Sequence, residues 1–262
     1  MKWKFFTLAV FSFLSSTFLI SQTDTIYLTN PSFEDVTARM GRPPHDWANA
    51  NCGFPAETEP DTHPGGHFDV VKPAFDGNTY LGMVVRDDET WEAVSQRMSQ
   101  AMKSGQCYEF TIMLARSELY ISQSQAYDVE ANYTTPAVLK IYGGYEYCDR
   151  KEVLGKTKEI INHRWVEYRF KFEPTEDFTF ITLEAFYRTP TLFPYNGNIL
   201  LDKASAIIPI PCDENFVIEE TTPPFVFPPN ALSSKKYQSC NPRFTKGPRD
   251  FIAEDVNLSI AL

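Results

Sequence analysis

The stretch W-V-E-Y-R-F-K-F, from Trp165 to Phe172, alternates apolar and charged side chains with one exception. Alternation with a period of two is typical of a strand with one face buried and the other in solvent. The face expected to be buried carries Val166, Tyr168, Phe170 and Phe172, and the charged face carries Glu167, Arg169 and Lys171. Trp165 is the exception on the charged face, and we expect it to pack against the protein.

Segments of the same kind lie on both sides of this stretch. Residues 107–115 alternate in the same way, and within residues 89–102, which also fit a helix, we favour a strand over residues 92–98. Further strands are expected at residues 79–86, 138–142, 178–187 and 198–208. No helical period of adequate length is present. About eight or nine strands in about 180 residues predict an all-β domain of two packed sheets.

Both ends of the chain depart from this β pattern. Lys2 and Lys4 precede an apolar run, which is the layout of a secretory signal peptide with cleavage after Ser21. An uncleaved membrane anchor is the alternative, but the run is short and interrupted by Ser and Thr. No later segment is apolar and long enough to span a bilayer. We therefore expect a signal peptide at residues 1–21, a β domain at 22–208 and a Pro-rich tail at 209–262. Such a protein is secreted or lies at the cell surface.

The charge of the chain restricts its partners. The formal net charge is −10, from 34 acidic and 24 basic residues, and loss of Lys2 and Lys4 with the signal peptide makes it −12. Because an acidic protein repels phosphate backbones, nucleic acid is not an expected partner. The same charge would attract calcium.

Five cysteines remain after cleavage, and none forms a C-x-x-C pair. They are Cys52, Cys107, Cys148, Cys212 and Cys240. The wide spacing argues against a zinc knuckle, and export permits disulfides. The odd number leaves at least one thiol free or paired with another chain, and the sequence leaves the pairing open.

Short motifs follow one another along residues 26–208. They are N-P-S-F-E at 30–34, G-N-T-Y-L-G at 77–82, Q-R-M at 96–98, G-Q-C-Y-E-F at 105–110, W-V-E-Y at 165–168 and L-D at 201–202. In order and spacing this set resembles the galactose-binding-like jelly-roll carbohydrate-binding modules of bacterial secreted and surface proteins. The resemblance implies a jelly-roll β-sandwich whose first and last strands meet. It also implies a non-catalytic function in binding.

The resemblance further implies a structural calcium ion where the first and last strands meet. Glu34 and Asp202 are the matching carboxylates, and loop carbonyls would complete the all-oxygen shell that calcium prefers. Lys203 stands where many members carry a second Asp or Asn. The alternative is that Asp202 caps a strand and Glu34 is a solvated turn acid.

Aromatic side chains on loops or strand edges are the candidates for sugar contact, because an aromatic ring stacks on the apolar face of a pyranose. The segment Y-G-G-Y-E-Y brings three phenols together, at Tyr142, Tyr145 and Tyr147. The other candidate ligand-binding residues are Trp47, Trp91 and Tyr120. The alternatives are a tight turn with ordinary tyrosines for the first group and a plug at one end of the sandwich for Trp47.

The loop D-T-H-P-G-G-H-F-D, from Asp61 to Asp69, places two imidazoles between two carboxylates. These groups suit a transition metal, but the spacing matches no helical zinc motif, and a solvated loop is the simpler interpretation. No G-x-S-x-G motif is present, and no cysteine has the context of a nucleophile.

These observations predict an exported, non-catalytic binding module that recognises carbohydrate or another cell-surface polymer. The alternative is a structural or adhesion module without glycan binding. A jelly-roll hydrolase would need two facing carboxylates in a cleft, which is a three-dimensional property.

Overall fold

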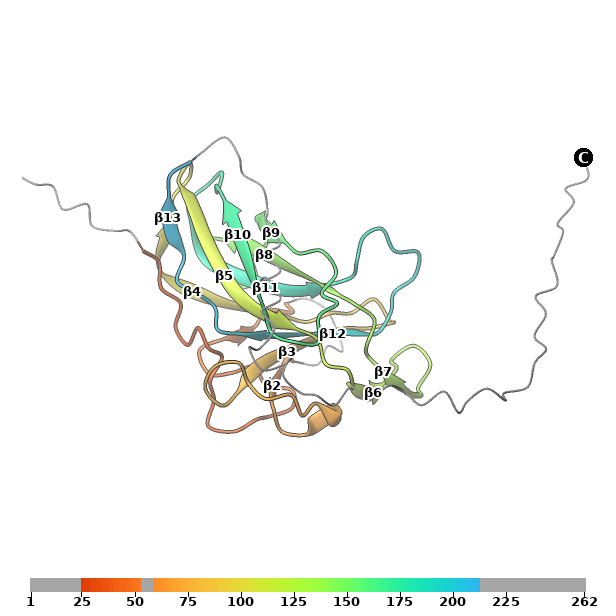
Figure 1. Ribbon diagram of the computed structural model, residues 1–262. Coiled ribbons are helices and arrows are strands. Elements are labelled where there is room, and N and C mark those ends of the chain that lie inside the picture. The colour runs from red at the N-terminus through yellow and green to blue at the C-terminus, as the bar shows by residue number, and fades with distance from the viewer. Residues whose placement is uncertain (1–24, 53–58, 213–262) are drawn as a thin grey trace, which may run out of the picture. The chain divides into compact units, whose positions relative to one another are not determined.

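Antiparallel strands make up nearly all the regular structure of the computed structural model, which describes residues 25–52 and 59–212 (Figure 1). The first sheet has the order β1 (Ala48–Asn49), β4 (Ala93–Met102), β11 (Phe178–Phe186), β8 (Val138–Gly144) and β9 (Glu152–Lys156). The second has the order β10 (Val166–Phe172), β5 (Cys107–Ala115), β12 (Gly197–Asp202), β3 (Tyr80–Val85) and β2 (Asp61–His63), with β13 (Ile208–Ile210) also beside β5. This arrangement confirms the predicted all-β jelly-roll sandwich.

Five short elements lie in the two long links that the sequence left without structure. The link after β5 contains the hairpin of β6 (Ile121–Gln123) and β7 (Glu130–Asn132). The link before β3 contains β1, β2 and the short 3₁₀ helix η1 (His67–Asp69). These elements have only two or three residues each, which is too short for a visible hydrophobic period.

The alternating stretch Val166–Phe172 forms β10 and pairs with β5 along its whole length. Phe170 lies opposite Phe110, and Phe172 lies opposite Tyr108, with all four side chains buried. Each large apolar side chain removed from water in this way stabilises the fold by about 2 kcal/mol. The two strands therefore fix the register of this edge of the sandwich.

The first and last segments of the described fold lie together, as the motifs implied. The backbones of Ile26 and Ile207 exchange hydrogen bonds of 2.9 Å, and Ala204 N–H donates to the Pro31 carbonyl at 2.8 Å. The expected strand at residues 198–208 is therefore interrupted, because residues 204–207 turn to the N-terminal segment. Lys203, with a φ of 43°, marks the interruption between β12 and β13.

The other expected strands are present with small changes in their ends, and residues 92–98 lie almost wholly in β4 rather than in a helix. Within the described residues no helix has the length and apolar character needed to cross a membrane. The chain divides into two units, Met1–Pro223 and Pro224–Leu262, and every described residue belongs to the first. The expected signal peptide and most of the Pro-rich tail lie outside the described residues.

Two disulfides resolve the pairing of four cysteines. Cys52 is bonded to Cys148, and Cys107 is bonded to Cys212. The second bond ties the chain beyond β13 to the start of β5, so the described fold continues past residue 208. Cys240 lies outside the described residues.

Candidate functional site

A cleft of about 1390 Å³ opens on the described surface. It lies where β9 ends and β10 begins, and so where the chain crosses from the first sheet to the second. The loop after η1, the start of the β5–β6 link and the residues after β11 complete its walls. With Val138 at the start of β8, five segments distant in sequence thus meet at one place.

Hydrogen bonds to the ends of neighbouring strands fix the crossover loop, residues 157–165. Asn162 Nδ2 donates to the Leu114 and Arg164 carbonyls at 2.8 Å each, and Tyr168 Oη donates to Asn162 Oδ1 at 2.7 Å. At the other end, Thr157 Oγ1 accepts the N–H of Leu139 at 2.9 Å. The loop is therefore part of the sandwich, and the cleft is formed before any ligand arrives.

The lining of the cleft mixes exposed aliphatic side chains with hydrogen-bonding groups. Val71, Leu119 and Ile161 are at least half exposed, so the cleft presents apolar surface to solvent. Lys156 Nζ donates to Thr189 Oγ1 at 2.5 Å on one wall. Apolar patches with a few fixed donors and acceptors are the usual composition of a ligand site.

Lys72 connects the wall after η1 to the crossover loop. Its ammonium group donates to the His163 carbonyl, and burial lowers its pKa. Arg116 supports the same loop from behind, because its Nη2 lies 3.1 Å from His163 Nε2 and its Nε donates to the Ile161 carbonyl at 3.3 Å. Lys72 and Arg116 therefore hold the crossover loop in place through hydrogen bonds, in addition to carrying positive charge.

The six aromatic candidates lie elsewhere, and none of them lines the cleft. Three of them are buried. Tyr142 donates to Glu184 Oε1 at 3.0 Å, and Tyr120 donates to Asp61 Oδ2 at 2.6 Å. Trp47 stacks on Phe33 at 5.0 Å and donates from Nε1 to the Asn30 carbonyl at 3.0 Å. These contacts agree with the plug interpretation of Trp47.

The other three aromatic candidates are partly accessible. Trp91 packs edge-on against Phe186 and Tyr187 at the margin of the core. Tyr145 and Tyr147 are 45% and 43% exposed, and Tyr147 borders a second, smaller hollow of about 340 Å³ beside Arg42 and Pro44. The sequence therefore predicted a cluster of three phenols, of which two reach the surface.

The two carboxylates expected to bind calcium meet the same loop from opposite ends of the chain. Both oxygens of Glu34 accept the N–H of Asn78, at 2.9 and 3.1 Å. Asp202 Oδ2 accepts the N–H groups of Phe75 and Asp76 at 2.7 and 3.0 Å, while its Oδ1 accepts the N–H of Lys203 at 2.7 Å.

N–H groups already make three hydrogen bonds to each carboxylate, which leaves about one of its four acceptor positions for a cation. Gly77 lies between these donors with a φ of 64°, and a Cβ there would collide with Glu34 Oε1. Burial is the largest influence on Asp202 and raises its pKa to about 6 against the opposing hydrogen bonds. The pair anchors the loop at residues 75–79, and calcium stays a prediction from the resemblance.

The His-containing loop at residues 61–69 is divided between two environments. Asp61 and His63 are buried in β2, whereas Asp69 is exposed and lines the cleft. Within the described residues, neither ring nitrogen of His63 has a hydrogen-bond partner, and burial lowers its pKa to about 3. A neutral, enclosed imidazole of this kind is part of the core.

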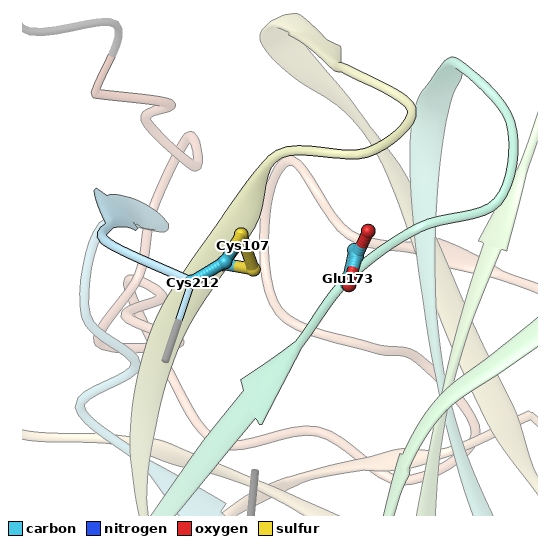
Figure 2. Close-up of side chains that lie close together, drawn as sticks. All are labelled: Cys107, Glu173 and Cys212. Atoms are coloured by element: carbon cyan, nitrogen blue, oxygen red, sulfur yellow. A yellow bond between two sulfur atoms is a disulfide. The ribbon is translucent and has the colours of Figure 1, made fainter. Parts of the chain in front are cut away.

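One group of metal-ligand types comes together within the described residues, namely Cys107, Glu173 and Cys212. Figure 2 shows that the two sulfur atoms are bonded to each other, with Glu173 beside them. Sulfur atoms in a disulfide are not the thiolates that a metal would need. This group is therefore a covalent connection and not a metal site.

The cleft residues were not predicted as a site. The available signal was the sequence K-T-K-E-I-I-N-H-R, residues 156–164, which concentrates basic side chains between two strands of an acidic chain. Its partners at residues 69–72, 117–119 and 188–189 come from other links. Their meeting depends on strand order, which no local pattern reveals.

Known proteins resemble this chain in structure and not in sequence. No protein-family model matches the chain, and no curated protein sequence matches it. Among solved structures, a cyclase from Fischerella sp. TAU is 11% identical with a TM-score of 0.46, covering 72% of this chain and 98% of its own. The CBM22-1 xylan-binding domain of Paenibacillus barcinonensis Xyn10C is 14% identical with a TM-score of 0.41, covering 73% and 97%.

The K1 cleaved adhesin domain of Lys-gingipain from Porphyromonas gingivalis is 10% identical with a TM-score of 0.38, and the alignment covers 65% of this chain and 96% of that one. Carbohydrate-binding modules are thus among the structures that the chain resembles, as the motifs predicted. The neighbours have different activities, and the similarity is one of fold.

Proposed function

We propose that the protein is an exported, non-catalytic module that binds carbohydrate in the cleft between β9 and β10. The observation that carries the proposal is the cleft itself. Its volume of about 1390 Å³ exceeds the roughly 300–1,000 Å³ of typical small-molecule pockets, so it suits several units of a polymer. Two disulfides among the described cysteines agree with export.

The lining supports a sugar polymer in particular. Aliphatic side chains such as Ile161 and Leu119 match the apolar faces of a pyranose, while Thr189 and the lysines match its hydroxyl groups. Hydrogen bonds to β5 and β8 hold the cleft open without ligand, which lowers the entropic cost of binding.

A glycan array with the mature chain tests the proposal, followed by measurement of Kd for each hit. Ile161→Glu places a charge on the exposed aliphatic surface of the cleft and is expected to weaken binding about tenfold. Val153→Glu is the matched control, because Val153 is a similarly exposed aliphatic residue on β9 that does not line the cleft. Equal effects of the two variants would contradict the proposed site.

A second arm tests the aromatic candidates predicted from the sequence. Tyr145→Ala with Tyr147→Ala is expected to leave Kd unchanged, because these side chains lie outside the cleft. A loss of binding in this double variant, with Ile161→Glu unaffected, would move the site to the smaller hollow. Silence across a broad array from folded protein would contradict carbohydrate binding and favour the adhesion alternative.

A further inference from the structure

The cleft has the opposite charge to the rest of the chain. Its lining contains five cationic side chains, Lys72, Lys156, Lys158, Arg164 and Arg188, and three carboxylates, Asp69, Glu118 and Glu159. The formal excess is therefore two positive charges in a chain whose net charge is −10. A concave positive surface within an acidic protein focuses anions onto that surface.

One carboxylate of the cleft is itself partly compensated. Glu159 Oε1 lies 3.6 Å from Arg188 Nη1. Contacts of this kind reduce the repulsion that a carboxylate exerts on an approaching anion. Lys158 and Arg164 project from the crossover loop as exposed residues, and both are accessible to a ligand.

The five cationic side chains come from different walls of the cleft and are not grouped at one position. Lys72 follows η1, Lys156 ends β9, Lys158 and Arg164 belong to the crossover, and Arg188 follows β11. The planar guanidinium groups of Arg164 and Arg188 suit two-point contact with a carboxylate or a sulfate group. A ligand with charges repeated along its length would meet these groups in turn.

We infer that the cleft selects a polyanionic glycan, whose sugars carry carboxylate or sulfate groups. This inference rests on the proposed function and names the class of its ligand. Repeated negative charges meet the basic rim, and the sugar rings between them meet Val71, Leu119 and Ile161. A neutral glycan would bring no negative charge to the basic rim.

The experiment uses pairs of polysaccharides that differ in charge alone. One pair is a polyuronate and its carboxyl-reduced form, and the other is a sulfated glycan and its desulfated form. Binding of the mature chain is expected to weaken about tenfold when the charge is removed, and to weaken as salt rises from low to physiological concentration. The pair that shows the larger loss identifies carboxylate or sulfate as the recognised group.

Charge variants connect this preference to the cleft. Lys158→Gln with Arg164→Gln is expected to weaken binding of the charged member about tenfold and to leave that of the neutral member unchanged. Lys151→Gln with Arg97→Gln removes the same two charges outside the cleft and is the matched control. Equal losses in both double variants would overturn the inference, because the preference would then reflect overall charge.

The remaining outcomes separate this inference from the proposed function. Equal affinity for charged and neutral members, with sensitivity to Ile161→Glu, would overturn the inference and leave carbohydrate binding intact. Absence of binding to any glycan would overturn both. Single-stranded DNA bound as tightly as the polyuronate would also overturn the inference, because the cleft would then recognise charge without sugar.

Discussion

The cleft and the aromatic cluster around β2 and β3 are built from different kinds of residue. Charged and exposed aliphatic side chains line the cleft, whereas mostly buried rings form the cluster. The aromatic cluster consists of His63, Phe68, Tyr80, Tyr120, Tyr133 and Trp165, which contact one another at ring distances of 5.1–6.0 Å. Its residues come largely from the links around β2 and β6, yet most of them are buried. The crossover loop at residues 157–165, by contrast, presents charged side chains to solvent.

Aromatic residues in long links are therefore not a reliable indication of a sugar platform. In this protein such rings form a small core that supports the hairpin β6–β7 and η1. These elements are short and bury few other side chains. Trp165 shows the principle clearly. Although the alternation places it with the charged side chains, Trp165 directly precedes β10, packs edge-on against Tyr80 at 5.2 Å and donates to the Pro73 carbonyl at 3.0 Å.

Removal of a ring from the aromatic cluster is expected to have the largest effect. Tyr120→Ala removes a buried ring stacked on Phe68 and the hydrogen bond to Asp61, so the free energy of unfolding should fall by roughly 3–5 kcal/mol. Lys158→Gln with Arg164→Gln should change it by no more than about 0.5 kcal/mol. Urea denaturation measures both. A small loss of stability together with lost glycan binding would assign Tyr120 to the ligand after all.

The second largest expected effect is a loss of folding stability at low pH. His63 is fully buried with a pKa lowered to about 3, whereas the unfolded chain binds this proton near pH 6.5. Stability supplied by the neutral ring is therefore present above pH 6.5 and is lost as pH falls toward 3. Because His63→Leu removes this titration, the native chain should lose roughly 2–3 kcal/mol more than the variant between pH 6 and pH 4.

Denaturation curves of the two proteins at each pH measure this difference, and titrations common to both cancel. Parallel pH profiles would show that His63 is not enclosed as described. The same comparison with Lys158→Gln should show no such divergence from the native chain, because that side chain is exposed.

The smallest expected effect concerns calcium and the loop at residues 75–79. With Glu34 and Asp202 already supplied with N–H donors, chelation should leave the Tm within about 1 °C. Thermal unfolding with and without a chelator, followed by restored calcium, measures this. A rise of several degrees on restoring calcium would support the ion implied by the resemblance and require the loop to turn its amides away.

Strands with strong alternation were predictable, and the reason is local. β10 carries its buried residues at every second position, and β5 does so from Tyr108 to Ile112, so the face that each turns to the core follows from the sequence. β9 was missed because its five residues include Gly155 and two charged side chains. The split of β12 from β13 depends on the pairing of Ile207 with Ile26, which is a distant contact.

The candidate site was less predictable than the fold. Burial of Tyr120 depends on β2 bringing Asp61 within hydrogen-bond distance, across 59 residues of chain. The cleft depends on residues 69–72 and 188–189 meeting residues 156–164, and composition carries no information about that meeting. The residue types indicated which side chains could contact a ligand. The order of the strands determined which of those side chains are accessible.

The Cys107–Cys212 bond has a mechanical consequence. It joins two residues that are 105 positions apart in the sequence, and the covalent loop that it closes contains β12 and β13. It also connects the last described residue directly to β5, which is an interior strand of the second sheet. Tension applied through the chain after Cys212 is carried into β5 by a covalent bond, so it does not peel β13 away one hydrogen bond at a time. A module loaded from this end is therefore protected against unzipping at its last strand.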